Sequence, residues 1–367
     1  MIAAFLAVQI ITRCDSAVIH YSSTFDVRTL GACATDKSTN ALWHLDRLDS
    51  GDGHLDGSYA RLPVHALVYV VDTGVEKNHD EFADGNVIAG LDVAPAGATQ
   101  CPEPALHPCI ELAQVDTHGT GVASMIGGRH VGVAPGASIV SVFTAGGSSA
   151  QVFLDAFNAI IANAWNPAMP QVKTAIVNLS NQLPAATSDS QRAAYAQMEA
   201  KMRDMTNGVD RDGKPDPKGK RFLFTIAGGN TGQCGSKNEV ALFPATLGVS
   251  ISGAITAGGI SKTNTMWSGT CRGDGIELFA PAEDIFAASN TGSNHYRLTA
   301  SSGTSWSAPI VAGVAARMLT ANPDLTPQEL ESLLESSPSA ISDAAPGPAD
   351  GRVVFVPTVA HRRSANH

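Results

Sequence analysis

The stretch ALVYVVDTG, residues 66–74, consists of six apolar residues followed by an aspartate, a threonine and a glycine. An uninterrupted apolar run of this length is typical of a β-strand that is buried on both faces of a parallel sheet. Similar runs recur along the chain and alternate with stretches of helical periodicity. This alternation predicts an α/β fold with a mostly parallel central sheet and helices on both sides. The expected strands are 66–71, 138–143, 174–179 and 222–227, and the expected helices are 152–165, 191–205 and 327–334.

The composition fits a globular protein and excludes some classes of partner. Of the 367 residues, 44% are hydrophobic and 16% are charged, which is enough apolar surface for a sizeable core. The formal net charge of −10 argues against nucleic acid, because binding to phosphates requires a basic surface. The apolar stretch Ile2–Ile11 is too short for a membrane span, which takes about 20 residues, and no other stretch is suitable. We read it either as part of a signal peptide or as a strand of an N-terminal segment.

Six cysteines are scattered along the chain without a CxxC pair, so their spacing does not indicate a zinc site. They are either buried free thiols or disulfides formed in an oxidising compartment. Cys101 and Cys109 bracket a short proline-rich loop and are a candidate disulfide pair. The remaining four are Cys14, Cys33, Cys234 and Cys271.

Three short motifs place reactive side chains at the ends of expected elements. Asp72 closes the first apolar strand, and sites in parallel sheets form at the carboxyl ends of strands. His118 begins the segment HGTGVAS, whose small residues allow a helix to pack closely against a sheet. Ser305, in GTSWSAP, begins a long apolar helix, where backbone N–H groups and the helix dipole suit an oxyanion.

These three side chains together predict nucleophilic catalysis. A serine hydroxyl needs a histidine to take its proton and a carboxylate to orient that histidine. The order Asp72, His118, Ser305 is one of the known arrangements of such a triad. An esterase of the α/β-hydrolase type would require a GxSxG motif and the order Ser, Asp, His, whereas residues 303–307 read GTSWS.

The motifs VYVVDTGV (68–75), HGTG (118–121) and GTSWSAPIVAG (303–313) resemble those of the subtilase family, the peptidase S8 serine proteases. WHLDRL (43–48) and LFAP (278–281) are similar to further segments of its proteinase K and aqualysin-like branch. The resemblance runs from Trp43 to about Val356. It implies a subtilisin-like three-layer α/β/α fold and a serine endopeptidase with the triad Asp72, His118 and Ser305.

The resemblance also implies a secreted monomer that acts on proteins or peptides and needs no cofactor for its chemistry. We expect residues 1–42 to be a remnant of a signal or pro-segment, residues 43–358 to be the catalytic domain and residues 359–367 to be a loose tail. Family members are usually made with a longer pro-domain than residues 1–42 could supply. This short front segment favours, weakly, an alternative in which a silent subtilase binds peptides or proteins without cleaving them.

Further site residues follow from the same resemblance. AGGN at 227–230 matches the family segment whose asparagine donates to the oxyanion, so Asn230 is expected to do this together with the backbone N–H of Ser305. The end of strand 174–179 would bind an extended substrate as an added β-strand. Cys234 and Cys271 fall where the aqualysin-like branch has a disulfide.

The substrate-binding segments predict a pocket for the residue before the cleaved bond. The small residues at 227–229 would form one wall, which implies a roomy slot and a preference for large apolar or aromatic side chains. The expected substrate-binding residues are Ser180, Asn181, Gln182, Ala227, Gly228 and Gly229.

Three positions depart from the family pattern. Gly121 stands where nearer relatives have a second histidine. Asn181 and Gln182 replace a small glycine-rich segment, which changes the depth and polarity of the neighbouring subsites. Trp306 follows the nucleophile where methionine or alanine is usual, and it either narrows the leaving-group side or packs in the interior.

Calcium is often bound in this family, but the sequence leaves any metal ligands unknown. The segment SKTNT at 261–265 lacks the carboxylate that the nearest relatives use. The loop with Asp210, Asp212 and Asp216 has oxygen ligands at suggestive spacing but lacks the last glutamate of an EF-hand loop. We read it as a solvated loop, with calcium binding as the alternative.

Overall fold

The computed structural model describes residues 18–20, 42–49, 51–55, 57–60, 64–94, 118–146, 149–289, 297–337, 340–341 and 351–355. Within them, a seven-stranded sheet has the order β4-β5-β3-β6-β7-β8-β9, and all neighbouring strands are parallel. Its strands are β3 (Leu67–Asp72), β4 (Val87–Asp92), β5 (Ser138–Phe143), β6 (Thr174–Leu179), β7 (Arg221–Ala227), β8 (Ala254–Ile260) and β9 (Leu278–Pro281).

The middle of the sheet forms the core because its strands are covered on both faces. All residues of β3, β6 and β8 are buried. In the register of the sheet, Asp72 lies opposite Phe143 of β5, and Val71 lies opposite Leu179 of β6. Asp72 therefore sits at the carboxyl edge of the sheet, beside the segment that follows β6.

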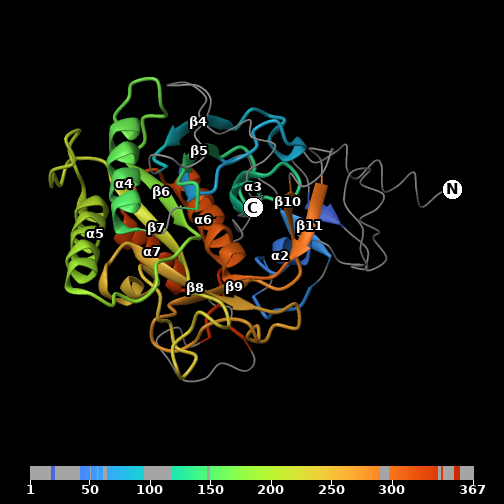
Figure 1. Cartoon of the computed structure of the whole chain (residues 1–367). Coiled ribbons are helices and arrows are strands. Elements are labelled where there is room, and N and C mark those ends of the chain that lie inside the picture. The colour runs from blue at the N-terminus through green and yellow to red at the C-terminus, as the bar shows by residue number, and fades with distance from the viewer. Residues whose placement is uncertain are drawn as a thin grey trace, which may run out of the picture.

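Helices cover both faces of the sheet, as Figure 1 shows. On one side α3 (His118–Gly127) packs against α6 (Thr304–Ala321), and α6 also contacts β6, β7, β8 and β9. On the other side α4 (Ala150–Ala164) packs against α5 (Asp189–Asn207), and α7 (Pro327–Glu335) contacts α5 and β7. This is the predicted three-layer α/β/α arrangement.

Smaller elements complete the described part of the chain. The short helix α2 (Trp43–Asp46) is fully buried, polar side chains included. Two small antiparallel sheets of two strands each, β1 with β2 and β10 with β11, lie outside the main sheet, and β10 contacts α3. Their bounds are β1 (Val18–His20), β2 (Ser58–Ala60), β10 (Ile285–Ser289) and β11 (Arg297–Ser301), and two 3-10 turns are η2 (Asp80–Phe82) and η3 (Ala245–Ser250).

The expected elements form, and their bounds differ from the expected ones by no more than one or two residues at strand and helix ends. The strands expected at 138–143 and 174–179 coincide with β5 and β6. Helix α4 begins earlier than its periodicity suggests because the Ser149 side chain accepts the N–H of Val152. The predicted capping box of Thr326 and Glu329 is present at the start of α7.

Among the described residues, no helix combines the length and the apolar character that a membrane crossing requires.

Candidate active site

Asp72 and His118 form the centre of the site. The Nδ1 atom of His118 lies 2.8 Å from Oδ1 of Asp72. Asp72 ends β3 and is fully buried, whereas the side chain of His118, the first residue of α3, is 26% exposed. A buried carboxylate on Nδ1 fixes the ring and leaves Nε2 as the atom that faces outward.

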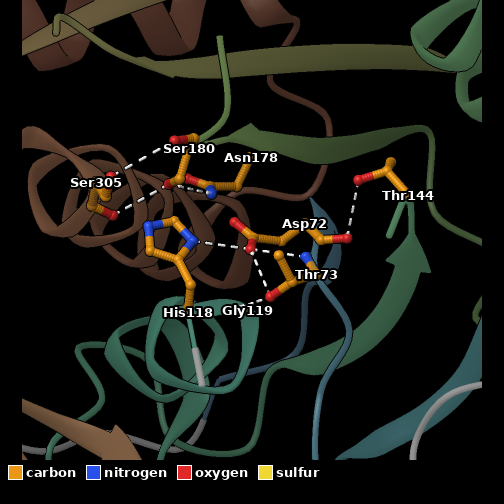
Figure 2. Close-up of polar contacts among 8 residues, drawn as sticks. All are labelled: Asp72, Thr73, His118, Gly119, Thr144, Asn178, Ser180 and Ser305. Carbon is orange, nitrogen blue, oxygen red and sulfur yellow. Dashed lines mark hydrogen bonds and ion pairs between the residues drawn. The ribbon is translucent and has the colours of Figure 1, made fainter. Parts of the chain in front are cut away.

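The carboxylate of Asp72 is held by the residue that follows it. Its Oδ1 accepts hydrogen bonds from the backbone N–H of Thr73 at 2.7 Å and from the Thr73 hydroxyl at 3.2 Å. Thr73 Oγ1 in turn accepts the backbone N–H of Gly119 at 3.0 Å, which ties β3 to the start of α3 (Figure 2). Asp72 Oδ2 is buried without a hydrogen-bond partner among the described residues.

The glycine after His118 is required by this close approach. A Cβ at Gly119 would lie 2.3 Å from the carbonyl oxygen of Gly74. No side chain fits there, so α3 can begin against the end of β3 only with glycine at this position. The HGTG motif thus places the histidine beside the aspartate through backbone contact.

Ser305 lies at the start of α6, on the other side of the imidazole from Asp72 (Figure 2). Its backbone carbonyl accepts a hydrogen bond from the Ser180 hydroxyl at 3.0 Å, and its own hydroxyl lies 3.5 Å from the Ser180 carbonyl oxygen. In a regular helix that Ser305 carbonyl would accept an N–H from residue 309, but Pro309 has none. The proline therefore frees the carbonyl to anchor the segment that follows β6.

Asn178, in β6, supports the same segment. Its side-chain nitrogen donates to Ser180 Oγ at 3.0 Å, and its oxygen accepts from the Thr225 hydroxyl of β7 at 3.1 Å. The side chain is fully buried. Asn178 is thus a structural residue of the site, and the N-glycosylation sequon that begins with it (residues 178–180) is inaccessible.

Asn230 follows β7 and is oriented by Thr304. Its Oδ1 accepts hydrogen bonds from the Thr304 N–H at 2.9 Å and from the Thr304 hydroxyl at 3.1 Å. The backbone N–H of Gly229 donates to the same hydroxyl at 3.0 Å. Because Oδ1 is committed to Thr304, which directly precedes Ser305, the Nδ2 donor is the part of the amide left for a ligand.

Trp306 packs beside the histidine. Its ring centroid lies 5.7 Å from that of His118, and the indole is 7% exposed. A Cβ at Gly121 would lie 2.9 Å from Cη2 and Cζ3 of the indole. Of the two interpretations of Trp306, the structure shows the packed one, and Gly121 is the residue that makes room for it.

The six expected substrate-binding residues lie on two segments beside Ser305. Residues 180–182 follow β6 and residues 227–229 end β7 and continue past it, and β6 and β7 are neighbours in the sheet. The side-chain nitrogen of Gln182 donates a hydrogen bond to the Ala227 carbonyl oxygen, which joins the two segments. The Nδ2 atom of Asn181 is buried and has no hydrogen-bond partner among the described residues.

A disulfide joins Cys234 and Cys271, the pair expected from the resemblance, with their Cα atoms 5.4 Å apart. It lies directly behind the second segment, because a Cβ at Gly229 would lie 2.9 Å from the Cys271 sulfur. The other expected pair, Cys101 and Cys109, lies outside the described residues.

Most of the residues considered for calcium form hydrogen bonds within their own loops. The hydroxyls of Ser261, Thr263 and Thr265 hydrogen-bond to one another, and this donor set without a carboxylate does not fit calcium. In the other loop, Asp210 Oδ1 accepts the backbone N–H groups of residues 212 and 214, and Asp216 Oδ1 accepts that of residue 218. These carboxylates stabilise turns of their own loop.

One acidic group lies among the described residues where β8, β9 and α7 meet. Oxygen atoms of Glu277, Glu331 and Glu335 come within 4.8 Å of one another. Burial, reinforced by the charges of Glu331 and Glu335, raises the pKa of Glu277 to about 8, although the Thr256 N–H donates to it. At neutral pH this carboxyl is therefore protonated.

Sequence reasoning missed two supporting residues, Thr73 and Thr304. Both stand next to a predicted catalytic residue, so their adjacency was the available signal. Their role depends on which way the hydroxyl points once the chain turns, and a motif does not encode that direction.

Comparison with known proteins places this geometry in a family. The family model described as the subtilase family, Peptidase S8, matches residues 65–352. The extracellular serine proteinase of Thermus sp. (strain Rt41A) is 30% identical over 339 residues, 90% of this chain and 69% of the relative. The alkaline serine exoprotease A of Vibrio alginolyticus is 28% identical over 311 residues, 83% of this chain and 48% of the relative.

A solved structure shows the same fold. The crystal structure of a cold adapted subtilisin-like serine proteinase is 26% identical, with a TM-score of 0.62, and the match covers 87% of this chain and 99% of that one. Together with the family match over most of the chain, this likeness shows that the chain belongs to the subtilase family of serine-type peptidases.

Proposed function

We propose that this protein is an endopeptidase that cleaves peptide bonds through an acyl-enzyme on Ser305. The observation that carries the proposal is the 2.8 Å contact between His118 Nδ1 and Asp72 Oδ1, with Ser305 on the other side of the imidazole (Figure 2). This arrangement allows His118 to take a proton at Nε2 while Asp72 stabilises the resulting imidazolium.

In the first half of the reaction, Ser305 Oγ attacks the carbonyl carbon of the peptide bond and gives its proton to His118. The carbonyl oxygen becomes an oxyanion, which accepts hydrogen bonds from Asn230 Nδ2 and from the Ser305 backbone N–H. When the intermediate collapses, the C–N bond breaks and His118 passes the proton to the leaving amine. The acyl group stays on Ser305.

In the second half, water replaces the amine. His118 takes a proton from the water, the hydroxide attacks the acyl carbon, and the ester bond to Ser305 breaks as the proton returns to Oγ. These steps use only side chains and water, so the chemistry needs no cofactor. The substrate would lie extended along the segment that follows β6, held by backbone hydrogen bonds.

The wider context follows from the relatives. We propose residues 43–358 as the catalytic domain, which the match to residues 65–352 supports. The extracellular naming of the Thermus relative supports secretion, and the disulfide fits an oxidising compartment. We propose a monomer that acts on proteins or peptides. The preference for large apolar residues before the cut, expected from the sequence, would require an open slot between residues 180–182 and 227–229.

A peptide with a blocked amino terminus and a blocked carboxyl terminus tests the endopeptidase function. We expect the wild type to cut it internally, with both fragments seen by mass spectrometry, and Ser305→Ala to leave it intact. Removal of terminal residues from the unblocked peptide alone would indicate an exopeptidase instead. Binding of the peptide without cleavage by the wild type would favour the silent binding module.

A further inference from the structure

We propose that Gln182 is a specificity-determining residue that fills the space for the side chain before the cleaved bond, so that the enzyme cuts after small residues. This inference rests on the proposed endopeptidase function. It replaces the large apolar preference expected from the sequence, because that expectation considered only the small residues of one wall.

The position of Gln182 relative to the nucleophile carries the first step. Ser180 contacts Ser305 through its hydroxyl and its carbonyl oxygen. On the other side, Gly229 and Asn230 hydrogen-bond to Thr304, the residue before the nucleophile. Ser305 therefore lies between the two segments. When the carbonyl oxygen of the acyl group on Ser305 accepts a hydrogen bond from Asn230, the side chain of that acyl group must point along the gap between the two segments.

Gln182 crosses this gap. Its side-chain nitrogen donates to the Ala227 carbonyl oxygen on the opposite segment, and its Oε1 would lie 3.6 Å from a Cβ at Gly229. The residue is half-buried. The amide thus lies against the wall formed by residues 227–229 and occupies the width of the slot.

The backbone at Gln182 has little freedom to withdraw. Leu183, the next residue, is fully buried and pairs with Phe243 through two backbone hydrogen bonds, at 2.6 and 2.9 Å. Ser180, two residues earlier, is anchored to Ser305 and Asn178. The chain on both sides of the glutamine is therefore fixed, and only the side chain could move.

The glycines of the opposite wall do not enlarge the slot. A Cβ at Gly228 would lie 2.5 Å from Ile276 Cδ1 and 2.9 Å from the Ala257 carbonyl oxygen. A Cβ at Gly229 would meet the Cys271 sulfur at 2.9 Å. A Cβ at either position would meet atoms behind the wall, and Gly229 also has a φ of 100°, which favours glycine, so packing and backbone conformation both account for these glycines. Their small size gives the substrate no extra volume.

The consequence is discrimination by size. The methyl group of alanine or the hydroxymethyl group of serine leaves the Gln182 amide in place. A phenylalanine or leucine side chain must displace the amide and leave the Ala227 carbonyl without this hydrogen bond. Loss of one hydrogen bond together with misfit in a specificity pocket changes kcat/KM by about tenfold or more.

A series of blocked tetrapeptide p-nitroanilides that differ only in the last residue, alanine, leucine or phenylalanine, tests this. The concentration of active enzyme is determined by titration with a fluorophosphonate. We expect wild-type kcat/KM for alanine to exceed that for phenylalanine at least about tenfold. Gln182→Gly should raise kcat/KM for phenylalanine relative to that for alanine at least about tenfold.

Two further variants separate the hydrogen bond from the volume and from general effects. Gln182→Glu has nearly the same size but cannot donate to the Ala227 carbonyl, so we expect it also to gain activity on phenylalanine. Gln151→Ala is the matched control, because Gln151 is exposed on α4 and its nitrogen donates to Asp155 at 2.8 Å. It should keep the wild-type preference.

The outcomes distinguish this inference from the proposed function. Suppose that the fluorophosphonate labels the enzyme, that the wild type prefers phenylalanine and that Gln182→Gly keeps this preference. This result overturns the role of Gln182 but does not contradict the proposed endopeptidase function. Absence of both labelling and cleavage overturns both proposals. If Gln182→Gly unfolds, as seen by circular dichroism, Gln182→Ala also removes the amide and provides the same comparison.

Discussion

The indole of Trp306 packs beside the imidazole of His118, with ring centroids 5.7 Å apart and 39° between the ring planes. The indole fits because Gly121, one turn into α3, has no side chain. Two departures from the family pattern, at positions 121 and 306, are therefore one feature of the interior. The indole restricts where the imidazole can lie.

Trp306→Ala should remove this packing. We expect kcat to fall about tenfold because a ring that is free to shift spends less time in the productive geometry, and the free energy of unfolding to fall by about 3–5 kcal/mol. Steady-state kinetics and denaturant unfolding measure the two effects. Gly121→Ala should lower both quantities as well, since its Cβ would displace the indole. Unchanged kinetics in both variants would show that the contact is only a packing contact.

Asn230→Ala tests the oxyanion donor. We expect kcat to fall about 100- to 1000-fold with little change in KM, as when subtilisin loses its side-chain donor, because the interaction is made mainly in the transition state. A loss that appears in KM alone would contradict this role.

Thr304 should act through Asn230. Thr304→Val removes the hydroxyl that donates to Asn230 Oδ1, so we expect kcat to fall by about tenfold, less than in Asn230→Ala. Thr304→Ser keeps the hydroxyl and should restore most of the activity. If Thr304→Val lowers kcat by the same factor in the Asn230→Ala background as in the wild type, Thr304 does not act through the asparagine.

His44 should make the fold sensitive to acid. Burial lowers its pKa to about 4, against the opposing effects of the Val131 carbonyl, which lies 2.9 Å from Nε2, and of Glu81. An unfolded histidine titrates near 6.5. Between these two pH values the unfolded state binds a proton that the folded state does not, so stability falls as the pH falls through 6.5 toward 4.

The size of this effect is about 2 kcal/mol between pH 7.5 and pH 5. Denaturant unfolding of the wild type and of His44→Gln, both on a Ser305→Ala background that prevents self-digestion, measures it. We expect the difference in unfolding free energy between the two proteins to shrink by that amount at pH 5. A constant difference would mean that the buried imidazole is not the titrating group.

Glu277 should give the stability the opposite pH dependence to that of His44. With a folded pKa of about 8 and an unfolded value near 4.5, the folded state holds a proton that the unfolded state has released, so stability falls as the pH rises from 4.5 to 8. Glu277→Gln keeps an acceptor for the Thr256 N–H but carries no charge at any pH. Relative to the wild type, it should gain on the order of 3–5 kcal/mol between pH 5 and pH 9. If the unfolding free energies of the two proteins change with pH in parallel, a group other than Glu277 causes the alkaline sensitivity.

The sequence predicts the four adjacent strands β5, β3, β6 and β7 and the places of the proposed triad residues, because these depend on local pattern, whereas β4, β8 and β9 are not among the expected strands. The apolar run at 66–71 can be satisfied only by burial, and its end fixes the place of Asp72. Likewise, the small residues after His118 and the proline after Ser305 define how each helix begins. These signals lie within a few residues of the side chains that they position.

The rest depends on contacts between distant segments. The resemblance identifies Gln182 as a substrate-binding residue, but its hydrogen bond to Ala227 could not be predicted, because it exists only since β6 and β7 are neighbours. The glycines at 228 and 229 suggested an open slot, but the atoms that they avoid come from Ile276, Ala257 and Cys271. The β10–β11 hairpin is also absent from the sequence prediction, since its strands have no distinctive run.

The most direct test of the triad is labelling with a fluorophosphonate probe, mapped by mass spectrometry on the wild type, Ser305→Ala and Asp72→Asn. We predict an adduct on Ser305 alone, no adduct in Ser305→Ala, and labelling of Asp72→Asn slowed by about three to four orders of magnitude, because the imidazole loses its orienting carboxylate. Absence of labelling in the folded wild type, or an adduct on another residue, would contradict the account.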